Sequence, residues 1–221
     1  MPWFRRRSAA PAAASAPSPL ASRRLHVGAG RERMEGWINL DIQDLPGVDV
    51  VADATQGLQF TDLEAVYAEH FLEHLPVDKA IDFLAECHRV LAPGGWLRLS
   101  TPNLDWVWST HYRLGAPAAE KVERAVMINR AFHGWRHRFL WNREILGRAL
   151  AACGFDEIRW CRWGESSEDL FRGIERHATY EDDDDLPHVI IAEACKGEAR
   201  PEELAELRGL LGREFLAHQR D

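Results

Sequence analysis

The sequence predicts an α/β fold in which a mostly parallel, doubly wound sheet is covered by helices. From residue 25 onward, short apolar runs of strand length alternate with helical patterns, which is typical of βαβ units. The first run, Leu25–Val27, leads into the G-x-G sequence Gly28–Gly30. The second run ends in an acid, Asp41. A glycine turn and an acid at the tips of successive strands indicate a ligand-binding edge in such a sheet.

Seven segments have the length and apolar content of strands. They are Arg24–Val27, Trp37–Asp41, Val48–Ala52, Ala65–Glu69, Trp96–Ser100, Glu157–Trp163 and His188–Cys195. Three further segments place apolar residues at the spacing of one helix face, namely Val77–Leu91, Arg143–Cys153 and Pro201–His218. Ala92–Gly95 is predicted to end the first helix and turn the chain into the next strand. Asp41 comes 11 residues after Gly30, so the first crossover is predicted to be one helical turn around Arg31–Glu35.

The length of 221 residues favours one domain with a sizeable core. Residues 1–24, rich in Ala, Pro, Ser and Arg, are predicted to be a disordered tail. Residues 25–196 form the predicted domain, with a substrate-side insert at 103–140, and residues 197–221 carry a C-terminal amphipathic helix. The acidic run Glu181–Asp185 is predicted to be a solvated loop.

Composition narrows the class of protein. The net charge of −8 disfavours a broad nucleic-acid-binding surface. No apolar run has the length of roughly 20 residues that a membrane span needs. The four cysteines lack zinc-site spacing and a C-x-x-C pair, so we expect reduced thiols, a cytoplasmic location and no structural zinc.

The glycine turn departs from a dinucleotide fingerprint. Position 33 is Arg rather than the third glycine, and Asp41 follows too soon for the roughly 20-residue spacing of that fold. A nucleotide-sugar or nicotinamide enzyme therefore remains only an alternative. Asp41 is placed to bind the two hydroxyls of a ribose, although it could also be a simple turn residue after a strand.

A set of ordered motifs carries a family resemblance. The strings LHVGAG-RERMEGWINLDI, VVADA, AEHFLEHL and ECHRVLAPGGWLRLSTPN resemble the class I S-adenosylmethionine-dependent methyltransferases over residues 25–196. More narrowly, the chain is similar to small bacterial methyltransferases found with polysaccharide biosynthesis genes. The resemblance implies a seven-stranded Rossmann-like sheet of order 3-2-1-4-5-7-6 with the last strand antiparallel. It also implies S-adenosylmethionine as the cofactor.

The resemblance assigns cofactor-binding residues position by position. Those expected to bind the cofactor are Gly28, Ala29, Gly30, Asp41, Ile42, Asp53, Ala54, Glu69, His70 and Phe71. By this resemblance the glycines lie under the methionine portion, Asp41 meets the ribose, and Asp53 with Ala54 meets the adenine. Glu69, His70 and Phe71 lie beside the transferring methyl. His26 departs from the family pattern, because many relatives have an acid at this position.

The implied reaction is in-line transfer of a methyl group to a hydroxyl or amine of a small molecule or saccharide. Such chemistry needs alignment and exclusion of water, and a hydroxyl acceptor also needs a base. His74 is the predicted general base, with Glu73 orienting it or acting instead. His133 and His137 are rival bases. These two histidines also lie four residues apart, as metal ligands on a helix do, but no third ligand is evident and no metal is predicted.

The insert at 103–140 is rich in Trp, His and Arg. Such side chains suit recognition of a polar, ring-shaped acceptor, but the same aromatic residues could instead form a cap on the sheet edge. The exposure of the rings distinguishes these alternatives, because rings that cap the sheet edge are buried against it. A catalytically silent binding protein on the same fold is a further alternative, because fold alone does not fix function. The acceptor and the oligomeric state are left open by the sequence.

Overall fold

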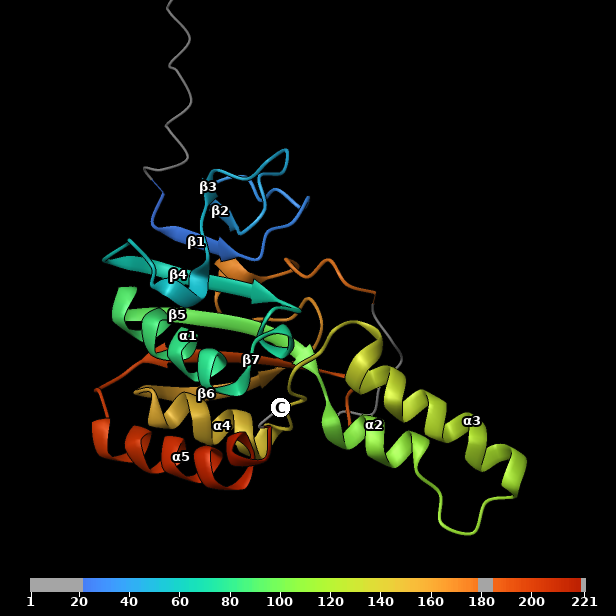
Figure 1. Ribbon diagram of the computed structural model, residues 1–221. Coiled ribbons are helices and arrows are strands. Elements are labelled where there is room, and N and C mark those ends of the chain that lie inside the picture. Colours follow the sequence, from blue (N-terminus) through green and yellow to red (C-terminus); the bar gives the residue numbers. More distant parts are fainter. Residues whose placement is uncertain (1–21, 179–184, 220–221) are drawn as a thin grey trace, which may run out of the picture.

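The computed structural model describes residues 22–178 and 185–219 (Figure 1). The predicted tail at 1–24 and the acidic run Glu181–Asp185 therefore lie almost entirely outside the described residues. None of the helices in the described ranges is long and apolar enough to span a bilayer.

Seven strands form one sheet. They are β1 (Arg24–Val27), β2 (Ile38–Asp41), β3 (Val50–Val51), β4 (Leu63–Glu69), β5 (Leu91–Pro102), β6 (Phe155–Cys161) and β7 (Val189–Lys196). Their order is β3-β2-β1-β4-β5-β7-β6, and β7 runs antiparallel to both of its neighbours. The predicted doubly wound topology and the antiparallel last strand are both confirmed. The carboxyl ends of β1, β2 and β4 consequently meet at one edge of the sheet.

One face of the sheet is covered by three helices, α1 (Val77–Val90), α4 (Arg143–Ala152) and α5 (Pro201–Glu214), as Figure 1 shows. The apolar residues of α1 recur every three or four positions and are buried, since this spacing puts them on one side of a helix. They pack with Val66 and Ala68 of β4 into the main core. The C-terminal helix ends at Glu214, and a 3-10 turn, Leu216–His218, follows it.

In the described part of the chain, the opposite face is covered without a crossover α-helix. The predicted helical turn around Arg31–Glu35 is wrong, because the chain there forms only turns before β2. Ala65 and Tyr67 alternate with the α1-facing residues of β4 and so point to this other face. They pack in a second apolar cluster with Phe171 and Ile174, which come from the residues after β6. We call residues 162–178 the cover segment.

A buried ion cluster holds the cover segment in place. Arg98 of β5 has no exposed side-chain surface and pairs with Glu175 of the cover segment and Glu193 of β7. The Arg98 Nε donates to Glu175 at 2.6 Å, and the second oxygen of Glu175 accepts from the Gly164 amide at 3.0 Å. Because all three side chains are buried, loss of one partner would leave an uncompensated buried charge.

The start of β5 differs from the prediction. The strand begins at Leu91, immediately after α1, so Ala92–Gly95 lies inside it rather than in a separate turn. The register with β4 shifts at this point, between Leu63 and Ala65, which accommodates the irregular stretch. A side chain at Gly95 would come within 2.9 Å of the Leu63 carbonyl oxygen, so the close approach of the two strands requires glycine here.

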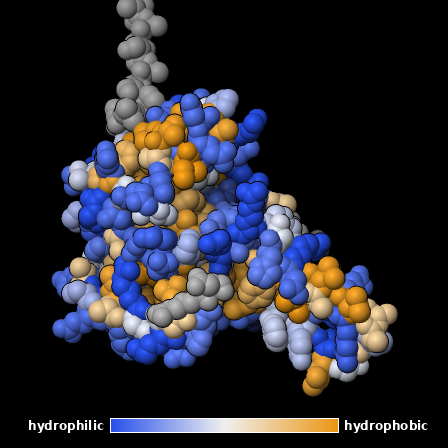
Figure 2. Space-filling model, in the orientation of Figure 1, coloured by the Kyte–Doolittle hydropathy of each residue, from blue (hydrophilic) through white to orange (hydrophobic). Residues whose placement is uncertain are grey.

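Two helices of the predicted insert project away from the sheet (Figure 1). We call residues 104–135 the arm; it comprises α2 (Leu104–His111), α3 (Ala118–Asn129), the residues between them, a short π-helical turn (Arg130–Gly134) and Trp135. No residue of α3 is buried, and hydrophobic surface is visible on the arm in Figure 2. Trp108 is 52% exposed and Trp135 is 56% exposed. These two rings therefore do not cover the sheet edge.

Candidate functional site

The loop after β1 takes a conformation that favours glycine. Gly28 and Gly30 have φ angles of +71° and +54°. A Cβ atom on Gly28 would lie 2.8 Å from Cδ2 of Phe71, so the absence of a side chain lets the Phe71 ring close against the loop. Phe71 is held from behind by Phe83 of α1, with ring centroids 4.9 Å apart. The loop and the residues after β4 are thus in direct contact.

Asp41 joins the tips of β1 and β2. Its Oδ2 accepts from the Gly30 amide at 2.8 Å, and its Oδ1 accepts from the Gln43 amide at 2.8 Å. The carboxylate is buried, whereas the neighbouring Ile42 side chain is exposed. Each carboxylate oxygen keeps a further lone-pair site after these bonds. Asp41 therefore shapes the loop and still has the capacity to accept from a ligand hydroxyl.

Asp53 caps the 3-10 turn Ala54–Gln56 that follows β3. Its Oδ1 accepts from the amide and the hydroxyl of Thr55 at 2.9 and 2.7 Å. These two bonds lower the pKa of the carboxyl group. Ala54, beside it, is buried. The predicted adenine-binding pair thus lies in a locally fixed turn.

Glu69, at the tip of β4, anchors the end of the cover segment. Its carboxylate accepts from the backbone amides of Arg176 and His177, both at 2.9 Å, and from Nδ1 of His177. Burial acts to raise the pKa of Glu69, but the bonds from His177 and Arg176 outweigh it and lower the pKa to about 2. Glu69 is therefore placed at the predicted edge, with its carboxylate turned to protein partners.

His70 follows in a left-handed conformation, with φ +46°, which is uncommon for a residue other than glycine. Its Nδ1 lies 2.8 Å from Oε1 of Glu73, and its ring meets the edge of His177 at a centroid distance of 4.9 Å. Burial lowers the pKa of His70, but the hydrogen bond and charge of Glu73 outweigh it and raise the pKa. The strained backbone aims this ring at Glu73.

Glu73, His74 and His137 form a compact group, which we call the His–Glu cluster. Their ligand-type atoms all lie within 4.8 Å of one another. Glu73 is fully buried on the 3-10 turn Leu72–His74, His74 is exposed, and His137 is half-buried. Thr101 donates its hydroxyl to Oε2 of Glu73 at 3.1 Å. Burial lowers the pKa of His137.

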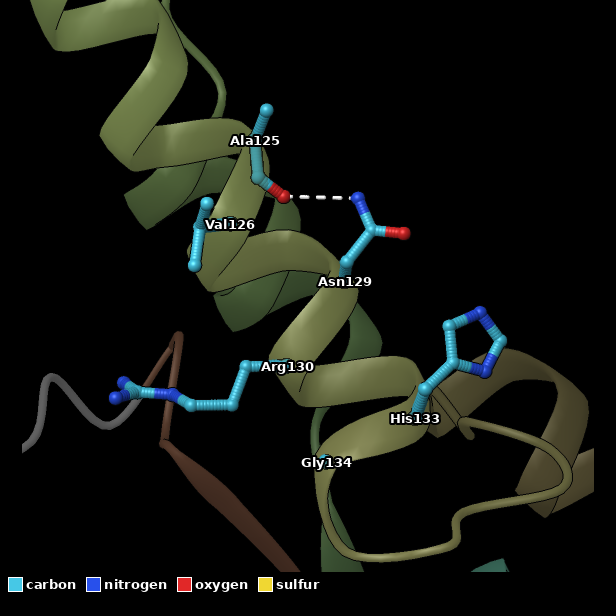
Figure 3. A pocket seen from close by; sticks show the side chains of 6 residues that line it. All are labelled: Ala125, Val126, Asn129, Arg130, His133 and Gly134. Atoms are coloured by element: carbon cyan, nitrogen blue, oxygen red, sulfur yellow. Dashed lines mark hydrogen bonds between the residues drawn. The ribbon is translucent and has the colours of Figure 1, made fainter.

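His133 is placed apart from this cluster. It is exposed on the π-helical turn and lines a hollow of about 600 Å³ on the surface of the arm. The hollow is lined by Ala125, Val126, Asn129, Arg130, His133 and Gly134. Figure 3 shows the His133 and Arg130 side chains pointing to different sides of the helix. The predicted bases Glu73 and His74 are therefore brought together with His137, whereas His133 lies outside the group.

Sequence reasoning did not single out the cover segment. His177 contacts both Glu69 and His70 although it lies 108 residues from Glu69 in the chain. The single histidine in the string RHATY has no spacing or motif that marks it. Only the fold, which returns the chain from β6 over the sheet, brings it to the site.

The chain is similar to known methyltransferases in part of its sequence and in its fold. Residues 25–99 match the family model of a methyltransferase domain, a stretch that runs from β1 into β5. No curated protein matches the chain. A structure of an S-adenosylmethionine-dependent methyltransferase from Archaeoglobus fulgidus is similar, with 19% identity, a TM-score of 0.51, and coverage of 80% of this chain and 87% of that one. A Thermotoga maritima structure, titled as a possible histamine N-methyltransferase, has 14% identity, a TM-score of 0.50, and coverage of 82% and 84%. At these identities, the structural matches support the fold.

Proposed function

Given that this chain is a class I S-adenosylmethionine-dependent methyltransferase, we propose that it methylates a hydroxyl or amine of a small molecule or saccharide. When bound, the cofactor supplies a methyl group on a positively charged sulfur, whose bond to carbon breaks as the acceptor's bond to carbon forms. The protein has to bind this cofactor, align the acceptor, exclude water and remove a proton.

We place the cofactor at the tips of β1, β2 and β4. Support comes from the glycine loop, where a Cβ on Gly30 would meet nothing within 4 Å, and from the buried Asp41 carboxylate that accepts from the Gly30 amide. The amides of such a loop suit close approach of a ligand, and Asp41 keeps lone pairs for ribose hydroxyls. The exposed Ile42 offers apolar surface next to that carboxylate. Asp53 and Ala54 complete the proposed edge.

We assign removal of the acceptor's proton to the residues after β4, with His74 as the general base and Glu73 as the group that positions it. The observation that carries this assignment is the His–Glu cluster, which lies directly beyond the Phe71 that closes on the glycine loop. His74 is exposed and so accessible to an acceptor, while Glu73 is buried and fixed by Thr101. An accessible imidazole beside a fixed carboxylate suits proton transfer.

The proposed acceptor class rests on the arm and on charge. Trp108, Tyr112 and Trp135 present exposed aromatic surface, which suits stacking on a sugar or phenol ring. The net charge of −8 disfavours a nucleic-acid acceptor.

Calorimetry with S-adenosylhomocysteine tests the cofactor site. We expect Asp41→Asn to weaken binding at least tenfold, because charge-assisted bonds of about 1.5–3 kcal/mol are lost. Asp44→Asn is the matched control, since Asp44 is an exposed acid three residues further on, and should keep the wild-type affinity. If both variants bind S-adenosylhomocysteine equally well, Asp41 is a structural residue at the strand end and does not bind the cofactor.

Release of S-adenosylhomocysteine in the presence of candidate acceptors tests the acceptor class. The panel should contain mono- and oligosaccharides, phenols and small amines, with a protein and an RNA fraction beside them. We expect turnover with one of the small acceptors. Turnover with a macromolecular fraction alone would overturn the proposed class while leaving the cofactor site intact.

A further inference from the structure

The His–Glu cluster has the composition of a metal site as well as of a base. It combines two imidazoles with one carboxylate, the ligand set of several catalytic zinc sites in which a further position stays open. A set with a single carboxylate is poor for Mg²⁺ or Ca²⁺, which prefer oxygen ligands, and good for a first-row transition ion.

The cluster is preorganised by backbone bonds between distant segments. The carbonyl oxygen of Glu73 accepts from the amides of Arg138 and Phe139 at 2.7 and 3.3 Å. These bonds fasten the residues after the arm to the residues after β4. His137 is therefore held beside Glu73 by the main chain, independently of any contact between their side chains.

Hydrogen bonds also fix the side chains of His137 and Glu73. Nδ1 of His137 lies 2.7 Å from the carbonyl oxygen of Ala131, which can only accept, so Nδ1 carries the proton. The Nε2 atom of His137 then has its lone pair available for a cation. Glu73 is fixed by His70 at one oxygen and by Thr101 at the other. Metal-binding histidines and carboxylates are held by outer partners of this kind.

We infer that Glu73, His74 and His137 hold one divalent transition-metal ion of the zinc type. The inferred role rests on the proposed function, since the ion lies where the acceptor's nucleophile would approach. Coordination of an acceptor hydroxyl at the open position would lower its pKa. In that arrangement His74 is a ligand and not the base, so the ion replaces the role that we assign to His74 in its absence, and the proton of the coordinated hydroxyl passes to solvent.

Zn²⁺ and Co²⁺ titrations test the inference on the full chain, prepared without a histidine tag and treated with a chelator. We expect one equivalent of Zn²⁺ by calorimetry, and visible absorption from bound Co²⁺. His74→Gln should weaken Zn²⁺ binding at least tenfold; because His74 is exposed, this variant keeps the fold. His137→Gln should do the same. His133→Gln is the matched control and should bind as the wild type does, because His133 lies outside the cluster.

Two results would overturn the metal site: a wild-type chain that binds no ion, or His74→Gln and His137→Gln variants that bind as tightly as His133→Gln. Calorimetry with S-adenosylhomocysteine in the presence of chelator separates this failure from that of the proposed function. Cofactor binding without metal binding would rule out the metal site and leave the proposed function standing. Metal binding without cofactor binding would rule out the proposed function and leave the metal site standing.

Discussion

At the scale of single residues, Gly28 carries two constraints that can be separated by experiment. Gly28→Ala combines a left-handed φ with a Cβ placed 2.8 Å from the Phe71 ring, whereas Gly36→Ala has φ +78° and open space around it. We expect about 1–2 kcal/mol of destabilisation from φ alone in both variants. Gly28→Ala should lose more and should also bind S-adenosylhomocysteine more weakly. Denaturant unfolding measures the stability, and calorimetry measures the affinity. Identical values for the two variants would show that the Phe71 ring moves aside without a measurable cost.

Glu69 makes stability depend on pH. Its pKa falls from an ordinary value of 4.5 to about 2, because the bonds from His177 and Arg176 outweigh burial. A lowered folded-state pKa means that the contribution is complete above pH 4.5 and is lost as the pH falls towards 2. The contribution is at most about 3 kcal/mol.

The test compares the unfolding free energy of the wild type with that of Glu69→Gln at pH 7, 4.5 and 3. We expect the wild-type advantage to shrink steadily as the pH falls. Glu64→Gln, which removes an exposed partner of Arg24 from the same strand, should show little pH-dependent difference. An advantage of Glu69 that stays constant over this range would contradict the assignment.

At the scale of elements, the cover segment depends on the buried cluster around Arg98. Arg98→Leu leaves Glu175 and Glu193 without their cation, and we expect a loss of about 3–5 kcal/mol. Arg148→Leu removes an exposed pair with Glu206 and should cost about 1 kcal/mol or less. Urea unfolding compares the two. Similar small losses would mean that the cover segment holds without the ion cluster.

The arm is expected to act on the acceptor and not on stability. Trp135 is exposed, so Trp135→Ala should leave the melting temperature nearly unchanged. With an acceptor in hand, we expect a higher KM at similar kcat, because a recognition contact made equally before and during reaction is lost. Trp141→Ala, at a fully buried ring, is the contrasting variant and should cost about 3–5 kcal/mol. An unchanged KM for Trp135→Ala would show that this ring of the arm does not take part in acceptor recognition.

At the scale of the whole molecule, the proposed cofactor edge draws on several strands, so ligand binding should stabilise the fold as a unit. S-adenosylhomocysteine at a hundred times its Kd should add about 2.7 kcal/mol to the free energy of unfolding. Thermal unfolding with and without ligand measures this, and Asp41→Asn should need more ligand for the same increase. A ligand without effect on unfolding would contradict binding to the native edge.

The sequence predicted those parts of the molecule that local patterns encode. The strand tips carrying Gly28 and Asp41 could be located from glycine, acid and apolar periodicity, and the family resemblance supplied the strand order. The contacts of Glu69 with His177, and of Glu73 with the residues after His137, could not be predicted. They join segments far apart in the chain through backbone groups, whose pairing leaves no trace in residue type.

The cover segment also limits how early the nascent chain can complete its fold during synthesis. Ala65 and Tyr67 are covered by Phe171 and Ile174, which leave the ribosome more than 100 residues later. β6 likewise waits for β7, its partner in the sheet. A nascent chain that stops before residue 171 therefore exposes an apolar sheet face, and native pairing of the last strands becomes complete only after residue 196 has emerged. For this protein, the interval between those two points is when a chaperone would have a surface to bind.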